Sequence, residues 1–125
     1  MARLLHPHFL KEEEYALPPL GLLSDLARGA AIPDMQELIG MTRRLKADLP
    51  AMLEEHRQIV GALVQLRSAA REAGRPEYEA FAEALTLHAQ TEEQVLYPAA
   101  ILVGDYLALR LGQSSTPEAR QEPAR

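Results

Sequence analysis

The sequence predicts an all-α protein, and three observations lead to that prediction. Helix-forming residues (Ala, Leu, Glu, Arg and Gln) occur throughout the 125 residues. Apolar residues recur three or four positions apart over long stretches, which is the spacing of one face of a helix. Alternating apolar and polar residues, which are typical of strands, do not persist. We therefore expect more than about two-thirds of the chain to be helical, against about one-third in an ordinary globular protein.

The first helix is predicted from about Leu4 to Leu17, with Pro7 accommodated in its opening turn. Pro18-Pro19 then ends or bends this helix. A short helical turn is expected around Leu20–Ala27, and Gly29 is a natural C-terminal stop.

A second, long helix is predicted to begin at Pro33, because proline suits the first position of a helix. Its apolar face includes His56, which an apolar environment would solvate poorly. Pro50 interrupts the hydrogen-bond ladder without interrupting the face, so we expect a kink or a tight restart there rather than a domain boundary. The predicted inward positions are Met35, Leu38, Thr42, Leu45, Leu49, Met52, His56, Ile59, Leu63, Leu66 and Ala70.

Gly74-Arg75-Pro76 marks a turn, and the last helix is predicted from Pro76 to about Leu111, with Gly112 as its stop. Residues 1–112 are expected to form one domain, and residues 113–125, almost without apolar side chains, a disordered tail. The predicted inner face of the last helix is Phe81, Leu85, His88, Glu92, Val95, Ala99 and Val103.

Composition excludes several classes of function. The chain has no cysteine, which rules out disulfides, thiolate metal sites and a cysteine nucleophile. A net charge of −5 without a basic stripe argues against nucleic acid as a partner. No apolar run approaches the roughly 20 residues that cross a bilayer, so no membrane partner is expected. The N-terminal residues do not resemble a signal peptide, and we expect a cytoplasmic protein.

An eleven-residue motif occurs twice. Residues 8–18 read HFLKEEEYALP and residues 88–98 read HAQTEEQVLYP, so histidine, two consecutive glutamates and proline agree in position. In each copy the histidine and the first glutamate are four residues apart, which places them one turn apart on one helix face. In both copies that face also carries the apolar residues.

The repeat predicts a metal site built from His8, Glu12, His56, His88 and Glu92. An unpaired buried carboxylate costs several kcal/mol, and Arg and Lys fall mostly on outer faces. A metal ion would satisfy the inward carboxylates and imidazoles together. Nitrogen and oxygen donors without thiolate suit iron or manganese, and zinc would also fit.

Simpler interpretations exist for parts of this pattern. A single His-x-x-x-Glu on a helix is usually a solvent-facing pair, and a lone inward histidine such as His56 is more often a core residue. The other glutamates and His6 are expected to face solvent, with Glu55 as an alternative neighbour of the metal ligands. The glutamates in this group are Glu13, Glu14, Glu54, Glu55 and Glu93.

The segments HFLKEEEYALPPL, EEHRQI and HAQTEEQVLYPAA resemble the hemerythrin-like, or HHE cation-binding, family. The resemblance implies an up-down helical bundle that binds two iron ions through histidines and two bridging carboxylates. The family's unit is a lone histidine followed on the next helix by His-x-x-x-Glu, used twice. His56 matches the lone histidine of the second unit, His88 and Glu92 its pair, and His8 and Glu12 the pair of the first. A lone histidine for the first unit would fall before Met1, so we expect a bundle truncated at its N-terminus.

The resemblance implies a non-haem iron protein that binds or senses a small diatomic or oxidant ligand, such as oxygen or nitric oxide, or that stores iron. One alternative is a di-metal oxidase or peroxidase-like enzyme, which an open position beside Tyr15 or Tyr97 would favour. Another is a non-catalytic interaction module with a vestigial site.

A bundle lacking one helix would leave a groove lined by residues such as Leu5, Tyr15, Leu38 and Leu45. The sequence therefore predicts a homodimer that covers this groove, with Ile32–Leu49 in the interface. The alternative is a monomer in which Ile32–Leu49 folds back over its own groove.

Overall fold

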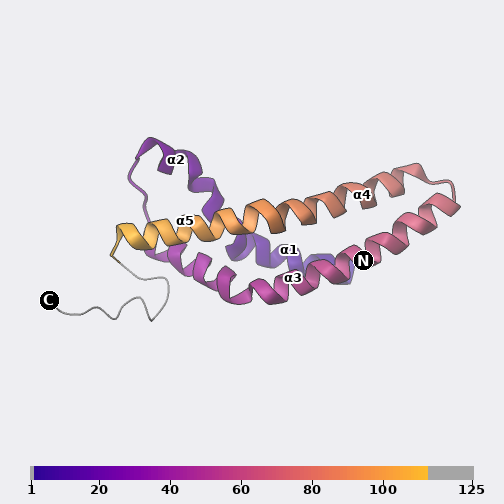
Figure 1. The fold of residues 1–125 in the computed structure, drawn as a ribbon, viewed down its shortest axis with the longest axis horizontal. Helices are drawn as coiled ribbons and strands as arrows, with labels where there is room; N and C mark the ends of the chain where they lie inside the picture. The colour runs from indigo at the N-terminus through magenta and orange to yellow at the C-terminus, as the bar shows by residue number, and fades with distance from the viewer. Residues whose placement is uncertain (1, 113–125) are drawn as a thin grey trace.

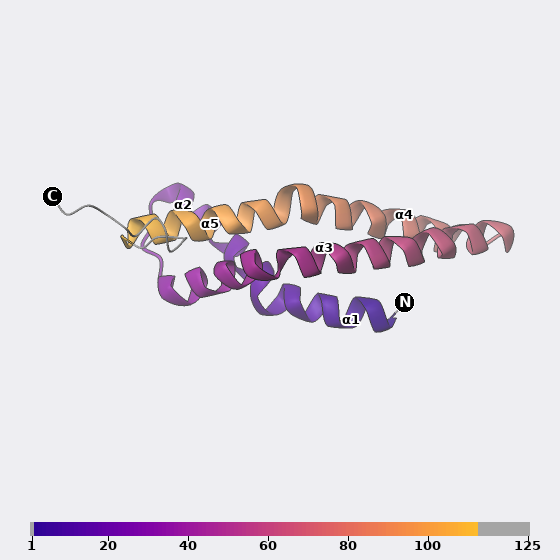
Figure 2. The same ribbon diagram turned by 60° about the horizontal axis from the view of Figure 1, so that its bottom comes forward.

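The computed structural model describes residues 2–112, and every regular element in that part of the chain is a helix. The all-α prediction is therefore confirmed. The longest helix, α3 (Met35–Glu72), runs antiparallel to α4 (Pro76–Thr91) and α5 (Tyr97–Arg110), which continue one another along a single rod (Figure 1). Helix α1 (Ala2–Lys11) packs along the middle of α3, on the side away from α4 and α5 in the view of Figure 2.

Short helical segments complete the first third of the chain. A π-helical turn, η1 (Glu12–Ala16), follows α1, and a 3-10 turn, η2 (Pro18–Leu22), leads into α2 (Leu23–Arg28). Gly29 ends α2 in a left-handed conformation (φ 72°), as expected for a glycine at that position. In Figure 1, α2 lies beside the C-terminal end of α5, so it covers the end of the molecule opposite to the α3–α4 turn.

The last helix is not continuous from Pro76 to Leu111 as predicted. A second π-helical turn, η3 (Glu92–Leu96), separates α4 from α5. The two π turns occupy equivalent places in the sequence repeat, and in each the glutamate carbonyl accepts a hydrogen bond from the residue five positions later. A proline (Pro18 or Pro98) follows the last residue of each turn by two positions, and its ring would crowd the carbonyl four residues earlier in a regular α-helix. A wider turn gives that carbonyl room.

Helix α3 begins two residues later than the sequence predicted. Asp34, not Pro33, precedes its first residue, and Asp34 has a left-handed backbone (φ 57°). The helix then passes through Pro50 without a restart and curves gently in Figure 1. Because Pro50 is exposed, the carbonyl that loses its helical partner lies on the side of α3 that water can reach.

The predicted inner face of the last helix is partly wrong. Phe81 and Val95 are 49% and 55% exposed, whereas Ala82 and Ala89 are buried. Small alanines let α4 approach α3 closely, and the larger side chains stay outside. Beyond Glu92, the extra residue of the π turn also changes which positions face inward, so that Tyr97 is fully buried.

The groove expected from a missing helix is not present as predicted. Tyr15 and Leu45 are buried, together with Met52, Tyr97 and Ala100, in one core cluster of the chain. Ile32 and Ile39 are buried in a second cluster with residues of α5. Much of the apolar side of Ile32–Leu49 is thus covered within the chain itself, while Leu38 and Leu49 are only partly buried.

Two further facts complete the fold. No helix of the described residues is long and apolar enough to cross a membrane. The tail predicted for residues 113–125 lies outside the described residues.

Candidate metal centre

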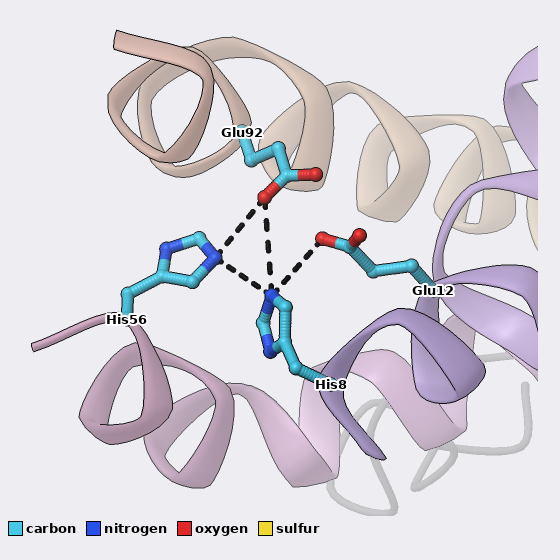
Figure 3. Close-up of side chains that lie close together, drawn as sticks. All are labelled: His8, Glu12, His56 and Glu92. Atoms are coloured by element: carbon cyan, nitrogen blue, oxygen red, sulfur yellow. Dashed lines mark hydrogen bonds and ion pairs between the residues drawn. The ribbon is translucent and has the colours of Figure 1, made fainter. Parts of the chain in front are cut away.

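Four of the five predicted ligands meet in one buried cluster. His8 comes from α1, Glu12 from the π turn that follows it, His56 from the middle of α3, and Glu92 from the start of η3 (Figure 3). Each side chain offers one donor atom, and these atoms all lie within 4.8 Å of one another. None of the four residues is more than 4% exposed.

The spacing of the donor atoms matches that of ligands around one ion. The Nε2 atom of His8 is 3.2 Å from Glu12 Oε2 and 2.9 Å from His56 Nε2, and His56 Nε2 is 3.0 Å from Glu92 Oε1. Bonds of about 2.1 Å at right angles place neighbouring ligands about 3 Å apart. The cluster is therefore already arranged at the scale of a first coordination sphere.

The fifth predicted ligand, His88, lies at the edge of this cluster. Its side chain is 50% exposed, and its Nε2 atom lies 2.9 Å from Glu92 Oε2. This approach does not form a hydrogen bond, so Glu92 Oε2 is a buried oxygen without a hydrogen-bond partner. The two oxygens of Glu92 consequently face different histidines: Oε1 faces His56, and Oε2 faces His88.

Two carboxylates outside the cluster hold the far nitrogens of the two central histidines. His8 Nδ1 donates to Glu55 Oε1 at 2.9 Å, and His56 Nδ1 donates to Glu93 Oε2 at 2.7 Å. Such contacts fix the ring orientation and leave Nε2 directed at the metal position. Lys11 Nζ in turn donates to Glu55 Oε2 at 2.6 Å.

The sequence interpretation of Glu93 as a purely solvent-facing residue is therefore wrong. Glu93 is exposed, but its carboxylate reaches back to His56. Its occurrence in both copies of the repeat was the available signal. Glu55 makes the contact with a predicted ligand that the sequence had left open as an alternative.

The sequence pattern did not predict that Tyr97 contacts the cluster. Its hydroxyl donates to Glu12 Oε2 at 2.6 Å and lies 3.2 Å from His56 Nε2. Tyr97 is five residues after Glu92, about 140° away on a regular α-helix. The wider π turn brings both side chains to the same side, and helical periodicity alone does not anticipate it.

The pKa values of the four cluster residues are shifted by burial and by hydrogen bonds to one another. Burial by itself would lower the pKa of His8, but hydrogen bonds to carboxylates, that of Glu12 foremost, raise it to about 10. The pKa of His56 is also raised, because Glu92 and Glu93 outweigh burial. Burial would raise the pKa of Glu92, yet hydrogen bonds from His56 and His8 hold it well below the ordinary value. Burial raises the pKa of Glu12.

The residues present fit a metal ion. The donor set is two imidazoles and two carboxylates, which suits iron, manganese or zinc and excludes metals that require thiolate. The raised pKa values of His8 and His56 favour the imidazolium form, whose positive charge a metal ion would replace. The buried oxygen of Glu92 without a hydrogen bond is a vacant lone pair in a place where water has little access.

Comparison with known proteins identifies one relationship. A family model described as the hemerythrin HHE cation binding domain matches residues 1–100. A search of curated proteins and a search of solved structures each gave no match.

Proposed function

Because the chain belongs to the hemerythrin HHE cation-binding family, we propose that it is a non-haem iron protein. Its role is to bind or sense dioxygen, nitric oxide or a related oxidant, or to store iron. The observation that carries the proposal is the buried cluster of two imidazoles and two carboxylates within 4.8 Å. Iron would supply redox chemistry and exchangeable coordination positions for a small ligand.

The ligands divide between two ions in this proposal. His8, Glu12, His56 and Glu92 hold one ion, and Glu92 bridges to a second through its other oxygen, which His88 approaches. The opposite orientation of the two Glu92 oxygens supports a bridging role. Water or a further residue would complete the coordination of the second ion on its exposed side.

Elemental analysis of protein purified without chelator tests the proposal directly. We expect iron at up to two ions per chain in the wild type and none in Glu92→Ala. His88→Ala should retain one ion, because the four central donors remain. His6→Ala is the matched control, since His6 is exposed on the same helix as His8. Equal iron in wild type and Glu92→Ala would refute the assignment.

The ligand-binding role has a separate measurement. Ferrous protein prepared without oxygen should change its visible spectrum when oxygen or nitric oxide is added. Release of iron on chelation after slow ferric loading, without any spectral response to these gases, would favour storage instead.

An oxidase or peroxidase-like activity is the second candidate, because the Tyr97 hydroxyl lies beside the cluster, 3.2 Å from His56 Nε2. Turnover of peroxide by the iron-loaded protein, absent from the metal-free protein, would support an enzyme. A melting temperature that does not change when iron is added would instead support an interaction module with a vestigial site.

Self-association is a further part of the proposal. Val64, Phe81 and Leu87 leave apolar surface exposed on the α3–α4 hairpin. A homodimer through this surface is an alternative to the interface first expected at Ile32–Leu49, where Leu38 and Leu49 are partly buried. A cytoplasmic location stays a prediction from the sequence.

A further inference from the structure

We infer that Tyr97 is itself a metal ligand, and that its phenolate oxygen is the fifth donor to the ion held by His8, Glu12, His56 and Glu92. The inference rests on the proposed function, because it requires that the cluster binds iron. It adds to the cluster a residue that neither the repeat nor its histidine and glutamate pattern indicates.

The position of the hydroxyl oxygen is the first argument. It lies 2.6 Å from Glu12 Oε2, 3.2 Å from His56 Nε2, and 3.4 Å from both His8 Nε2 and Glu92 Oε1. One oxygen is therefore close to the donor atoms of all four residues. Tyr15, the other fully buried tyrosine, instead directs its hydroxyl to Asp48 and Met52, outside the cluster.

The distances between these donor atoms match three edges and one diagonal of the square base of a pyramid. In the order Glu12, His8, His56, Glu92, successive donor atoms are 3.2, 2.9 and 3.0 Å apart, and the diagonal from His8 Nε2 to Glu92 Oε1 is 3.9 Å. With bonds of about 2.1 Å, such a base has edges of about 3.0 Å and diagonals of about 4.2 Å. An apical ligand would lie about 3.0 Å from all four base atoms, and the Tyr97 oxygen lies between 2.6 and 3.4 Å from them.

The hydrogen bonds of the Tyr97 hydroxyl group also support a metal at this position. A phenol has one proton, and the short contact to Glu12 uses it. The phenol oxygen also lies 3.4 Å from Glu92 Oε1, a much longer contact for the same single proton. A cation among the five donors would be shared by both carboxylates and the phenol oxygen, whereas one proton serves mainly Glu12. When the cation binds, the oxygen–hydrogen bond of Tyr97 breaks, the proton leaves to solvent, and the oxygen keeps its electron pair for the metal.

The position of Tyr97 directly after the π turn supports this role. Tyr97 is the first residue after the π turn that begins at Glu92, and it is completely buried. The equivalent residue of the first repeat is Leu17, which has no donor atom. The two halves of the site therefore differ in chemistry, and only the half containing Tyr97 has a phenol at the ion.

Resonance Raman spectroscopy of the ferric protein tests the inference. The protein is loaded with ferrous iron, oxidised with stoichiometric ferricyanide, and excited within its visible absorption. We expect enhanced ring vibrations of a metal-bound tyrosinate, complete loss of them in Tyr97→Phe, and retention in Tyr15→Phe, the matched buried control. Iron per chain is measured on every sample.

A second variant keeps the test decisive if Tyr97→Phe does not fold. The chain has four tyrosines, so replacing Tyr15, Tyr78 and Tyr106 together by Phe leaves Tyr97 alone. Tyrosinate vibrations in this variant support the inference. Bound iron without tyrosinate vibrations in the wild type overturns the role of Tyr97 but not the proposed function. Failure to bind iron at all overturns both.

Discussion

At the scale of single residues, the second glutamate of each repeat shows how position decides role. Glu13 and Glu93 occupy equivalent places in the sequence, and both are exposed. Only Glu93 has a histidine within reach, because His56 of α3 lies beside it at 2.7 Å. The same residue type in the same motif therefore orients a predicted metal ligand in one copy and not in the other.

This difference leads to a matched pair of variants. Glu93→Ala should weaken metal binding by roughly 10- to 100-fold, because His56 loses the acceptor that fixes its ring. Glu13→Ala should leave the affinity unchanged. Competition titration with a chromogenic chelator measures both, and equal affinities for the two variants would contradict an orienting role for Glu93.

The raised pKa of His8 predicts a pH dependence of the metal-free protein. The His8 pKa rises from 6.5 to about 10 on folding, so its stabilising contribution is complete below pH 6.5 and is lost as the pH rises through about 10. We expect the melting temperature of chelator-treated protein to fall across this interval. Circular dichroism at several pH values measures it.

His6→Gln is the control for this pH dependence and should retain it, while His8→Gln should reduce it. Metal affinity should change in the opposite direction. An ion must displace the imidazole protons, so binding should tighten as the pH rises through the same interval. A metal-free protein whose melting temperature rises from pH 6.5 to 10 would contradict the assigned protonation of His8.

At the scale of the elements, helix packing depends on one close approach between α3 and α5. A Cβ atom added at Gly104 would lie 1.7 Å from Thr42 Oγ1 and 2.3 Å from Thr42 Cβ. Gly104 is buried in the middle of α5, and Thr42 is buried in α3. The absence of a side chain at this point is what lets the two helices come together.

Gly104→Ala should therefore destabilise the fold by about 1–3 kcal/mol, because the helices must separate to admit one methyl group. Gly61→Ala is the control: a Cβ atom there meets nothing within 4 Å, and we expect stabilisation of roughly 0.5–1 kcal/mol. Urea unfolding of both variants decides the matter. A neutral Gly104→Ala variant would show that the helices can shift at little cost.

At the scale of the whole molecule, the α3–α4 hairpin leaves apolar side chains in solvent. Val64 and Leu87 are 56% and 62% exposed on opposite helices of the hairpin. If they meet a second copy, light scattering at micromolar concentration should give about 28 kDa, twice the chain mass of 13.9 kDa. Replacing Val64 and Leu87 by Gln should then restore the single-chain mass, whereas a wild-type mass near 14 kDa would exclude the dimer.

The sequence by itself determined the fold class and the ligands it could offer. Helical periodicity is a local property, so it predicted helices and placed His8, Glu12, His56 and Glu92 on inward faces before any contact was known. The repeated motif connected the two distant segments, and the first glutamate of each copy, Glu12 or Glu92, is buried in the cluster, whereas only one of the two motif histidines, His8, is buried.

Only the tertiary structure decided what depends on contacts between helices and on small departures from helical geometry. The π turn at Glu92 changes the phase of the following residues, which brings Tyr97 to the cluster and leaves Val95 in solvent. Glu93 gains its role from His56, 37 residues earlier in the chain. A pattern with a regular period of 3.6 residues does not predict where a π turn adds a residue to the helix. No local pattern determines which helix lies beside another. The π turn and the neighbouring helix both depend on the packing of the whole chain.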